Sequence, residues 1–84
     1  MGRNEKLLAR LKQKPKDFIW GELTNLLKSL GYTQKKAGKT GGSRRRFVHS
    51  TAPTITLHKP HPDRIVKRYV INDILELLKR EGMI

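Results

Sequence analysis

The sequence contains no cysteine, so it can form no disulfide bond and offers no thiolate nucleophile or cysteine-based metal site. It also lacks any apolar run approaching the about 18 residues that a membrane-spanning helix needs. Its N-terminal segment is charged and has no apolar stretch typical of a signal peptide. From these absences we expect a soluble, cytoplasmic protein.

Acidic residues are scarce, since seven Asp and Glu stand against 19 Lys and Arg and give a formal net charge of +12. For a chain of 84 residues this charge is large, and it favours nucleic acid as a partner. A membrane surface fits less well, because the basic residues are not gathered on one face of a single amphipathic helix. The length indicates one domain with a small core.

Apolar residues recur at helical spacing in the first half of the chain. The repeating positions are Ile19, Leu23, Leu26, Leu27 and Leu30. They form one stripe of an amphipathic helix, which we expect to be buried. Asp17 is a plausible N-terminal cap, and Gly31 is expected to end the helix because glycine takes a left-handed conformation at little cost.

Two further helices are expected near the ends of the chain. One runs from about Tyr69 to Arg80, with Ile71, Ile74, Leu75 and Leu78 on its apolar side. The other covers residues 4–12 and is so short that it is marginal alone. We therefore expect residues 1–14 to be a loosely attached helical appendage and residues 15–84 to be the domain.

Three strands are predicted between the long helices, at residues 32–37, 43–49 and 54–58. Two amphipathic helices can cover only one face of such a sheet, which leaves the other face open to water. The expected fold is therefore an α+β sandwich of the order α-β-β-β-α, with an extra short N-terminal helix.

Strand alternation predicts which side chains lie on the open face. If Phe47 packs under the helices, Arg45 shares its side at the rim, whereas Arg44 and Arg46 point to the open face. On the third strand Ile55 and Leu57 point inward, and Thr54, Thr56 and His58 point outward. The open face would then combine arginines with a histidine.

Clustered Lys and Arg on the first two strands and their connecting turn suggest a phosphate-binding surface, because the arginine guanidinium matches phosphate oxygens. The predicted RNA-binding residues are Lys35, Lys36, Lys39, Arg44, Arg45 and Arg46. A simpler interpretation is that these charges only keep an exposed strand from pairing with other chains.

Histidine is the residue type most suited to proton transfer near neutral pH, and the chain has three. His58 is the strongest candidate because it is expected on the open face. His61 lies between two prolines in a loop, and His49 ends a strand, which is most often a packing position. The spacing of acidic residues around these histidines does not indicate a metal site, and no cofactor is expected.

Four runs of the sequence together resemble a known family. They are ELTNLLKSLGY (22–32), GSRRRFVH (42–49), PHP (60–62) and ILELLKREG (74–82). In their order and spacing they are similar to the HicA-type toxins of bacterial and archaeal toxin–antitoxin systems. The resemblance covers roughly residues 17–84 and leaves the first helix outside.

The resemblance implies a small double-stranded-RNA-binding-like fold. It also implies an mRNA endonuclease, or mRNA interferase, that is held inactive by a HicB antitoxin. In the family, the residue after Gly-Ser in the second strand is usually a catalytic histidine, and here it is Arg44. Arginine binds phosphate but is a poor proton shuttle, because a guanidinium does not give up its proton near neutral pH.

Three functions remain open at this point. The first is a metal-independent endoribonuclease toxin, with Arg44, His58 and His61 as its catalytic residues. The second is a non-catalytic RNA-binding module of the same fold. The third is a protein-interaction role, in which the basic face docks an acidic antitoxin-like partner.

Overall fold

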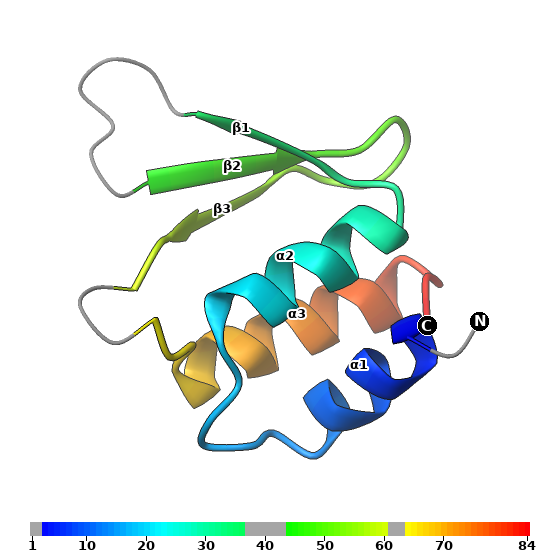
Figure 1. Ribbon diagram of the computed structural model, residues 1–84. Coiled ribbons are helices and arrows are strands. Elements are labelled where there is room, and N and C mark those ends of the chain that lie inside the picture. The colour runs from blue at the N-terminus through cyan, green and yellow to red at the C-terminus, as the bar shows by residue number, and fades with distance from the viewer. Residues whose placement is uncertain (1–2, 37–43, 61–63) are drawn as a thin grey trace.

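A computed structural model describes residues 3–36, 44–60 and 64–84 of the chain (Figure 1). The elements are α1 (Arg3–Lys12), α2 (Trp20–Ser29), β1 (Thr33–Lys36), β2 (Arg44–Val48), β3 (Ile55–His58) and α3 (Arg68–Arg80). The predicted α+β order of helix, three strands and helix, with an additional N-terminal helix, is confirmed. The likeness to a double-stranded-RNA-binding domain stays a prediction.

The sheet, the pair of helices α2 and α3, and helix α1 lie in layers (Figure 1). The three strands are antiparallel and neighbour each other in the order β1-β2-β3. Helices α2 and α3 lie against one face of this sheet, and α1 lies on the far side of those helices. None of the described helices covers the second face of the sheet, as the sequence predicted.

The core lies between the sheet and helices α2 and α3. Phe47 is fully buried and sits opposite Gln34 on β1 and the buried Ile55 on β3. The ring of Trp20 lies 5.9 Å from the ring of Phe47, centroid to centroid. The helices contribute the buried residues Leu23, Leu26, Leu27, Ile71, Ile74, Leu75 and Leu78. The inward orientation predicted for Phe47 and Ile55 is confirmed, and Leu57 is half-buried beside them.

The start of α2 differs from the prediction. Its N-cap is Ile19, which is 43% exposed, whereas the sequence suggested a cap at Asp17 and a buried Ile19. Both expectations are wrong because contacts with other segments set the start of this helix. The Asp17 carboxylate accepts a hydrogen bond from Arg10 at 3.2 Å, and the backbone N–H of Ile19 donates instead to the carboxylate of Glu22 at 3.0 Å.

A short antiparallel bridge between Ile19 and Ile65 ties the start of α2 to the segment before α3. The N–H of Trp20 donates to the carbonyl of Arg64, and the N–H of Val66 donates to the carbonyl of Phe18, both at 2.8 Å. Phe18 and Val66 are buried on either side of this bridge. The contact fixes how the first turns of the two helices lie relative to each other.

Helix α1 packs against α2 and α3 and shares their core. Leu11 is fully buried, and Arg10 donates two hydrogen bonds to the carboxylate of Glu22, at 2.9 and 3.1 Å. The guanidinium also lies 5.5 Å from the ring centre of Phe18. Helix α1 is thus docked, in contrast to the loose attachment that its length suggested. The division into residues 1–14 and 15–84 stays a prediction.

Candidate nucleic-acid interface

The uncovered face of the sheet carries the side chains that the alternation assigned to it. Arg44 on β2 lies directly opposite His58 on β3. Two residues further along β2, Arg46 lies between Lys35 on β1 and Thr56 on β3. All five side chains are exposed. We refer to Lys35, Arg44, Arg46, Thr56 and His58 as the open face.

No negative charge balances the open face locally. The sequence has no Asp or Glu between Gly31 and Asp63. Within residues 3–36, 44–60 and 64–84, the side chains of Arg44, Arg46 and His58 form no hydrogen bond or ion pair. Their donors are therefore available to an anion from solution, for which a phosphodiester is a good geometric match.

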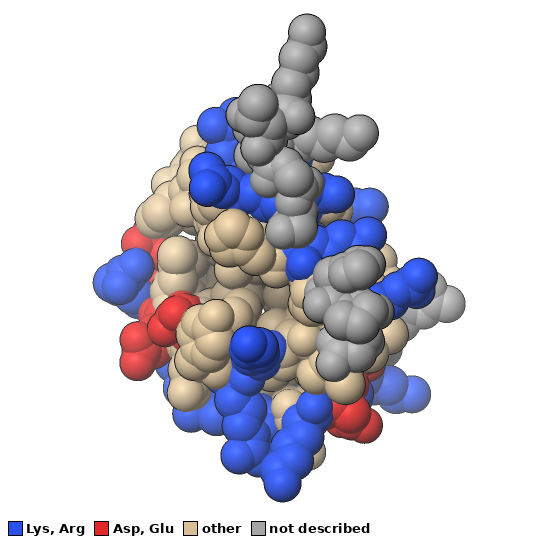
Figure 2. Space-filling view, turned by 90° about the vertical axis from the view of Figure 1, so that its left-hand side faces the viewer, with Lys and Arg blue, Asp and Glu red and all other residues tan. Residues whose placement is uncertain are grey.

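Basic residues also surround the end of the sheet where β2 begins and β3 ends. Figure 2 looks at the molecule from this end, and Lys and Arg side chains gather at the top and the bottom of the view, with uncharged surface between them. The visible acidic side chains lie toward the margins of this view. A chain of phosphates approaching here would meet positive charge first, which favours association with a polyanion.

Arg45 lies on the other side of the sheet from its two neighbours. It sits opposite Leu57 on the helix-facing side, it is half-buried, and its Nη1 donates to the carbonyl of Arg44 at 2.9 Å. This is the rim position that the alternation predicted. The same strand therefore directs cationic side chains to both sides of the sheet.

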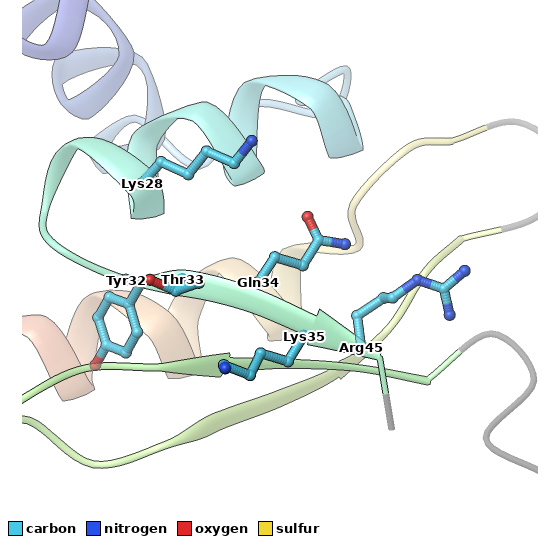
Figure 3. Close-up of a pocket in the computed structure, with 6 residues that line it drawn as sticks. All are labelled: Lys28, Tyr32, Thr33, Gln34, Lys35 and Arg45. Carbon is cyan, nitrogen blue, oxygen red and sulfur yellow. The ribbon is translucent and has the colours of Figure 1, made fainter. Parts of the chain in front are cut away.

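Arg45 lines a groove of about 550 Å³ between α2 and the edge strand β1, together with Lys28, Tyr32, Thr33, Gln34 and Lys35. Figure 3 shows Gln34 and Arg45 pointing to the side of the sheet where α2 lies, with Lys28 extending from the helix itself. Lys28 was not among the predicted RNA-binding residues. In the sequence, Lys28 is only a basic residue near the end of a helix. Its proximity to β1 depends on tertiary packing, which the local pattern does not contain.

Three predicted site residues cannot be placed in full. Lys39 and His61 lie outside the described residues. The backbone of Lys36 pairs with Arg45 at the end of β1, and its side chain is likewise outside the described part. Their predicted roles stay predictions.

His49 has a structural role that the geometry makes clear. Its Nδ1 accepts hydrogen bonds from the backbone N–H groups of Thr51 and Ala52, both at 3.1 Å. Nδ1 is therefore unprotonated, and Nε2 carries the hydrogen that it donates to the carbonyl of Leu30 at 3.1 Å. The ring joins the end of α2 to the β2–β3 turn, which makes His49 a packing residue.

Gly31 and Tyr32 complete this junction. Gly31 has a φ of +100°, so the predicted glycine terminus of α2 is confirmed, and a Cβ there would lie 2.8 Å from Nε2 of His49. The hydroxyl of the buried Tyr32 donates to the carbonyl of Pro53 at 3.0 Å. Burial, and to a lesser extent the charge of Glu81, raises the pKa of Tyr32, which keeps this hydroxyl protonated as a donor.

Comparison with protein families adds to this geometry. Residues 20–80 match the family described as the HicA toxin of bacterial toxin–antitoxin systems. The chain belongs to the HicA toxin family. It is thus a toxin of a toxin–antitoxin system, and such a toxin has an antitoxin partner. No curated protein and no solved structure matches the chain.

The family match begins at Trp20, so helix α1 lies outside the matched residues. Among the described residues of this HicA toxin, no helix is long and apolar enough to cross a membrane. In the same ranges, no cluster of three or more His, Cys, Asp or Glu side chains is arranged to hold a metal ion.

A second hollow of the HicA fold lies where β3 ends and α3 begins. We call it the apolar cleft; its volume is about 360 Å³. Apolar lining comes from Trp20, Pro60, Ile65, Val66 and Val70. Its remaining lining residues are His58, Lys59, Lys67 and Tyr69. His58 therefore belongs both to the open face and to this cleft, which sequence reasoning did not find.

Proposed function

We propose that this HicA toxin acts on RNA as a metal-independent endonuclease and is neutralised by a HicB-like antitoxin. The observation that carries the proposal is the direct pairing of Arg44 with His58 on the exposed face of the sheet. The pairing brings a phosphate-binding cation and a proton-transfer group to one place. Directly opposed residues of an antiparallel pair have Cβ atoms about 4.5–5.5 Å apart, so one phosphodiester can contact both side chains.

The proposed reaction is cleavage by the ribose 2′-hydroxyl. Its oxygen attacks the adjacent phosphorus, a new P–O2′ bond forms, and the bond from phosphorus to the 5′-oxygen of the next nucleotide breaks. The 2′-hydroxyl proton goes to a base, and the departing 5′-oxygen takes up a proton. The products are a 2′,3′-cyclic phosphate and a free 5′-hydroxyl. The enzyme must supply proton transfer and stabilise the charge of the pentacoordinate phosphorus.

The open face offers groups for these tasks. His58 is the proposed proton-transfer residue, because a neutral imidazole accepts a proton and an imidazolium donates one near neutral pH. Arg44 and Arg46 are the proposed phosphate ligands, because the fork of a guanidinium matches the oxygens of a phosphate. His61 stays a candidate for the second proton transfer.

Binding of the remaining RNA is assigned to the other basic residues of the first two strands and their turn. Lys35 extends the open face toward the edge of the sheet. Lys36, Lys39 and Arg45 complete the proposed RNA-binding set. Contacts of this kind go to phosphates and 2′-hydroxyls, so they position the RNA with little sequence readout. An acidic surface of the antitoxin would neutralise the toxin by covering the same cations.

A second candidate function follows from the residue at position 44. The family resemblance places a catalytic histidine there, and this chain has Arg44. An arginine at that position favours phosphate binding over proton transfer. The corresponding function is a non-catalytic RNA-binding module that retains the fold.

Incubation of the purified protein with end-labelled RNA in EDTA tests the endonuclease. We expect fragments that end in a 2′,3′-cyclic phosphate, detected by mass spectrometry. RNA that is bound but uncut would instead support the non-catalytic module. In that case Arg44→His should produce cleavage. Lys79→Ala, which changes an exposed α3 residue away from the open face, serves as the control for loss of one charge.

A further inference from the structure

The apolar cleft has the dimensions and the position of a ligand site next to the open face. Its volume of about 360 Å³ falls within the about 300–1,000 Å³ typical of small-molecule sites. The Ile19–Ile65 bridge holds two of its walls together, because Trp20 and Val66 are the residues whose N–H groups close that bridge. The cleft is thus built by backbone contacts between segments far apart in the sequence.

An exposed aromatic ring stands at this cleft. Tyr69 is 64% exposed, and Ile65 beside it in the lining is 37% exposed. The other aromatic residues of the described chain, Phe18, Trp20, Tyr32 and Phe47, are all buried. An aromatic ring in water next to apolar surface offers a stacking partner to a flat ligand.

The charges around the cleft select an anionic ligand. Lys59 and Lys67 line it and are exposed, and no acidic residue is among the described residues of the lining. Lys67 is also the N-cap of α3 and no side chain caps this helix, so the positive end of the helix dipole adds to the field. A ligand with a flat apolar part and a negative charge fits this combination.

We propose that the apolar cleft binds one unpaired nucleobase of the RNA substrate, stacked on Tyr69, while Lys59 and Lys67 hold the adjoining phosphates. The inference rests on the proposed RNA-directed function. It identifies the substrate class as RNA that is single-stranded at the bound position. A base inside a double helix is covered by its neighbours on both sides, so only an unpaired base can leave the stack and enter the cleft.

His58 connects this cleft to the phosphate site. It lines the cleft and lies opposite Arg44 on the open face, so a nucleotide whose base occupies the cleft has its backbone next to the Arg44–His58 pair. The cleft would therefore select the phosphodiester that reaches His58. Placement by a bound base is a way to orient a reacting bond without sequence-specific hydrogen bonds.

The test compares binding of a single strand and of a duplex. The probe is a fluorescent RNA about eight nucleotides long, 2′-O-methylated so that it lacks the attacking hydroxyl, used alone or annealed to its complement. We expect Tyr69→Ala to raise Kd for the single strand about 5- to 100-fold, since each stacked base contributes on that order. Tyr69→Phe keeps the ring and should recover most of the affinity.

The duplex and Arg46→Ala separate this inference from the proposed function. Duplex affinity should be the same for wild type and Tyr69→Ala within about two-fold, because duplex binding depends on phosphate contacts. Arg46→Ala should weaken the binding of both the single strand and the duplex. If Arg46→Ala weakens binding and Tyr69→Ala does not, the cleft proposal is overturned while the RNA-directed function stands. If Tyr69→Ala weakens the binding of the single strand and of the duplex equally, the cleft proposal is also overturned. If the wild-type protein binds neither probe at low salt, both proposals are overturned.

Discussion

The two faces of the sheet contrast sharply, although the same three strands build both. On the helix-facing side, Phe47 and Ile55 are buried, and they join the core formed by α2 and α3. On the open face, Arg44, Arg46 and His58 are exposed and carry no acidic partner in the described chain. Alternate residues of one strand thus contribute to stability and to the proposed function. Phe47 stabilises the core, whereas its neighbour Arg46 is proposed to bind RNA.

This separation has a physical origin in the period of two residues along a strand. Apolar side chains on one side stabilise the fold by their removal from water. Uncompensated cations on the other side would repel one another, and their repulsion makes this face a poor place for stability but a good one for binding a polyanion. Substitutions on the open face should therefore lower activity with little change in stability. Substitutions on the helix-facing side should lower stability.

The largest expected effect is on catalysis from the open face. His58→Ala should lower the RNA cleavage rate about 10²- to 10⁴-fold, because it removes a proton-transfer group. RNA affinity should change only a few-fold, whereas Arg44→Ala should weaken both cleavage and binding. Single-turnover cleavage and fluorescence anisotropy measure the two quantities. Equal cleavage by wild type and His58→Ala would reject His58 as the proton shuttle.

The next effect is on stability from the covered face. Phe47→Ala should lower the free energy of unfolding by about 3–5 kcal/mol, since it empties a fully buried position. A domain of this size has only a small margin of stability, so the variant is expected to be largely unfolded. Arg46→Ala is the matched control and should change stability by less than about 0.5 kcal/mol. Similar losses in urea denaturation for both variants would contradict the division between the faces.

A third prediction asks whether helix α1 stabilises the fold in addition to α2 and α3. Leu11→Ala in α1 should cost about 2–5 kcal/mol because Leu11 is fully buried. Lys12→Ala, at the exposed neighbouring position, is the control. Removal of residues 1–12 should lower the thermal midpoint and still leave dispersed amide NMR signals if residues 15–84 are the folding unit. An unchanged midpoint in Leu11→Ala would show that α1 is only loosely attached.

Salt dependence provides a smaller and more graded test of the open face. If basic side chains neutralise about four phosphates of a single-stranded RNA, a plot of log affinity against log salt concentration should have a slope near −3. Arg46→Ala should reduce the steepness by about 0.7, the contribution of one phosphate contact. Lys79→Ala, which removes a charge elsewhere, should leave the slope unchanged. Binding that does not depend on salt would exclude a phosphate-based interface.

The smallest expected effect is acid sensitivity, and it should come from the helical side. Arg10, by its hydrogen bonds, lowers the pKa of Glu22 below the ordinary value of 4.5. A carboxylate with a lowered folded-state pKa stabilises the fold above its unfolded pKa, and this stabilisation is lost as the pH falls through the folded pKa. We therefore expect the urea concentration at the unfolding midpoint to decrease as the pH is lowered below about 4.5. The decrease should be less steep in Glu22→Gln.

The matched control for that measurement is Glu76→Gln. Glu76 is exposed on α3, and the structure shows no ion pair for it within the described ranges. Its substitution should leave the pH dependence as in wild type. A pH dependence that is the same in all three proteins would place the acid-sensitive contact elsewhere.

Patterns over a few neighbouring residues predicted the helix, its end and the two faces of the sheet. The leucine spacing indicated α2, the glycine at position 31 indicated its end, and strand alternation assigned Arg46 and Phe47 to opposite faces. Each of these features depends on residues within a few positions of one another. The family resemblance added the toxin class, which the later family match supports.

Features that depend on distant contacts were not predictable from these patterns. Ile19 pairs through its backbone with Ile65, 46 positions away, and its side chain is exposed, whereas Trp20 is buried against Phe47. Asp17 pairs with Arg10 on a helix that the sequence suggested was loosely attached. The apolar cleft joins residues from α2, the end of β3 and the start of α3, and no single stretch of sequence contains its pattern.

The junction of Gly31 with His49 constrains how the sequence can change. A side chain at position 31 would collide with the imidazole, and loss of the imidazole would leave the carbonyl of Leu30 and two backbone N–H groups without their partner. Position 31, just after a helix, and position 49, just after a strand, therefore each carry a separate structural constraint: the first needs glycine and the second needs a ring that bonds on both sides. Removal of the imidazole would open space at position 31, but it would not relieve the strain that a φ of +100° imposes on any side chain there. Because this junction lies at the end of β2 opposite to Arg44, substitutions at the cationic end should leave the attachment of sheet to helix in place.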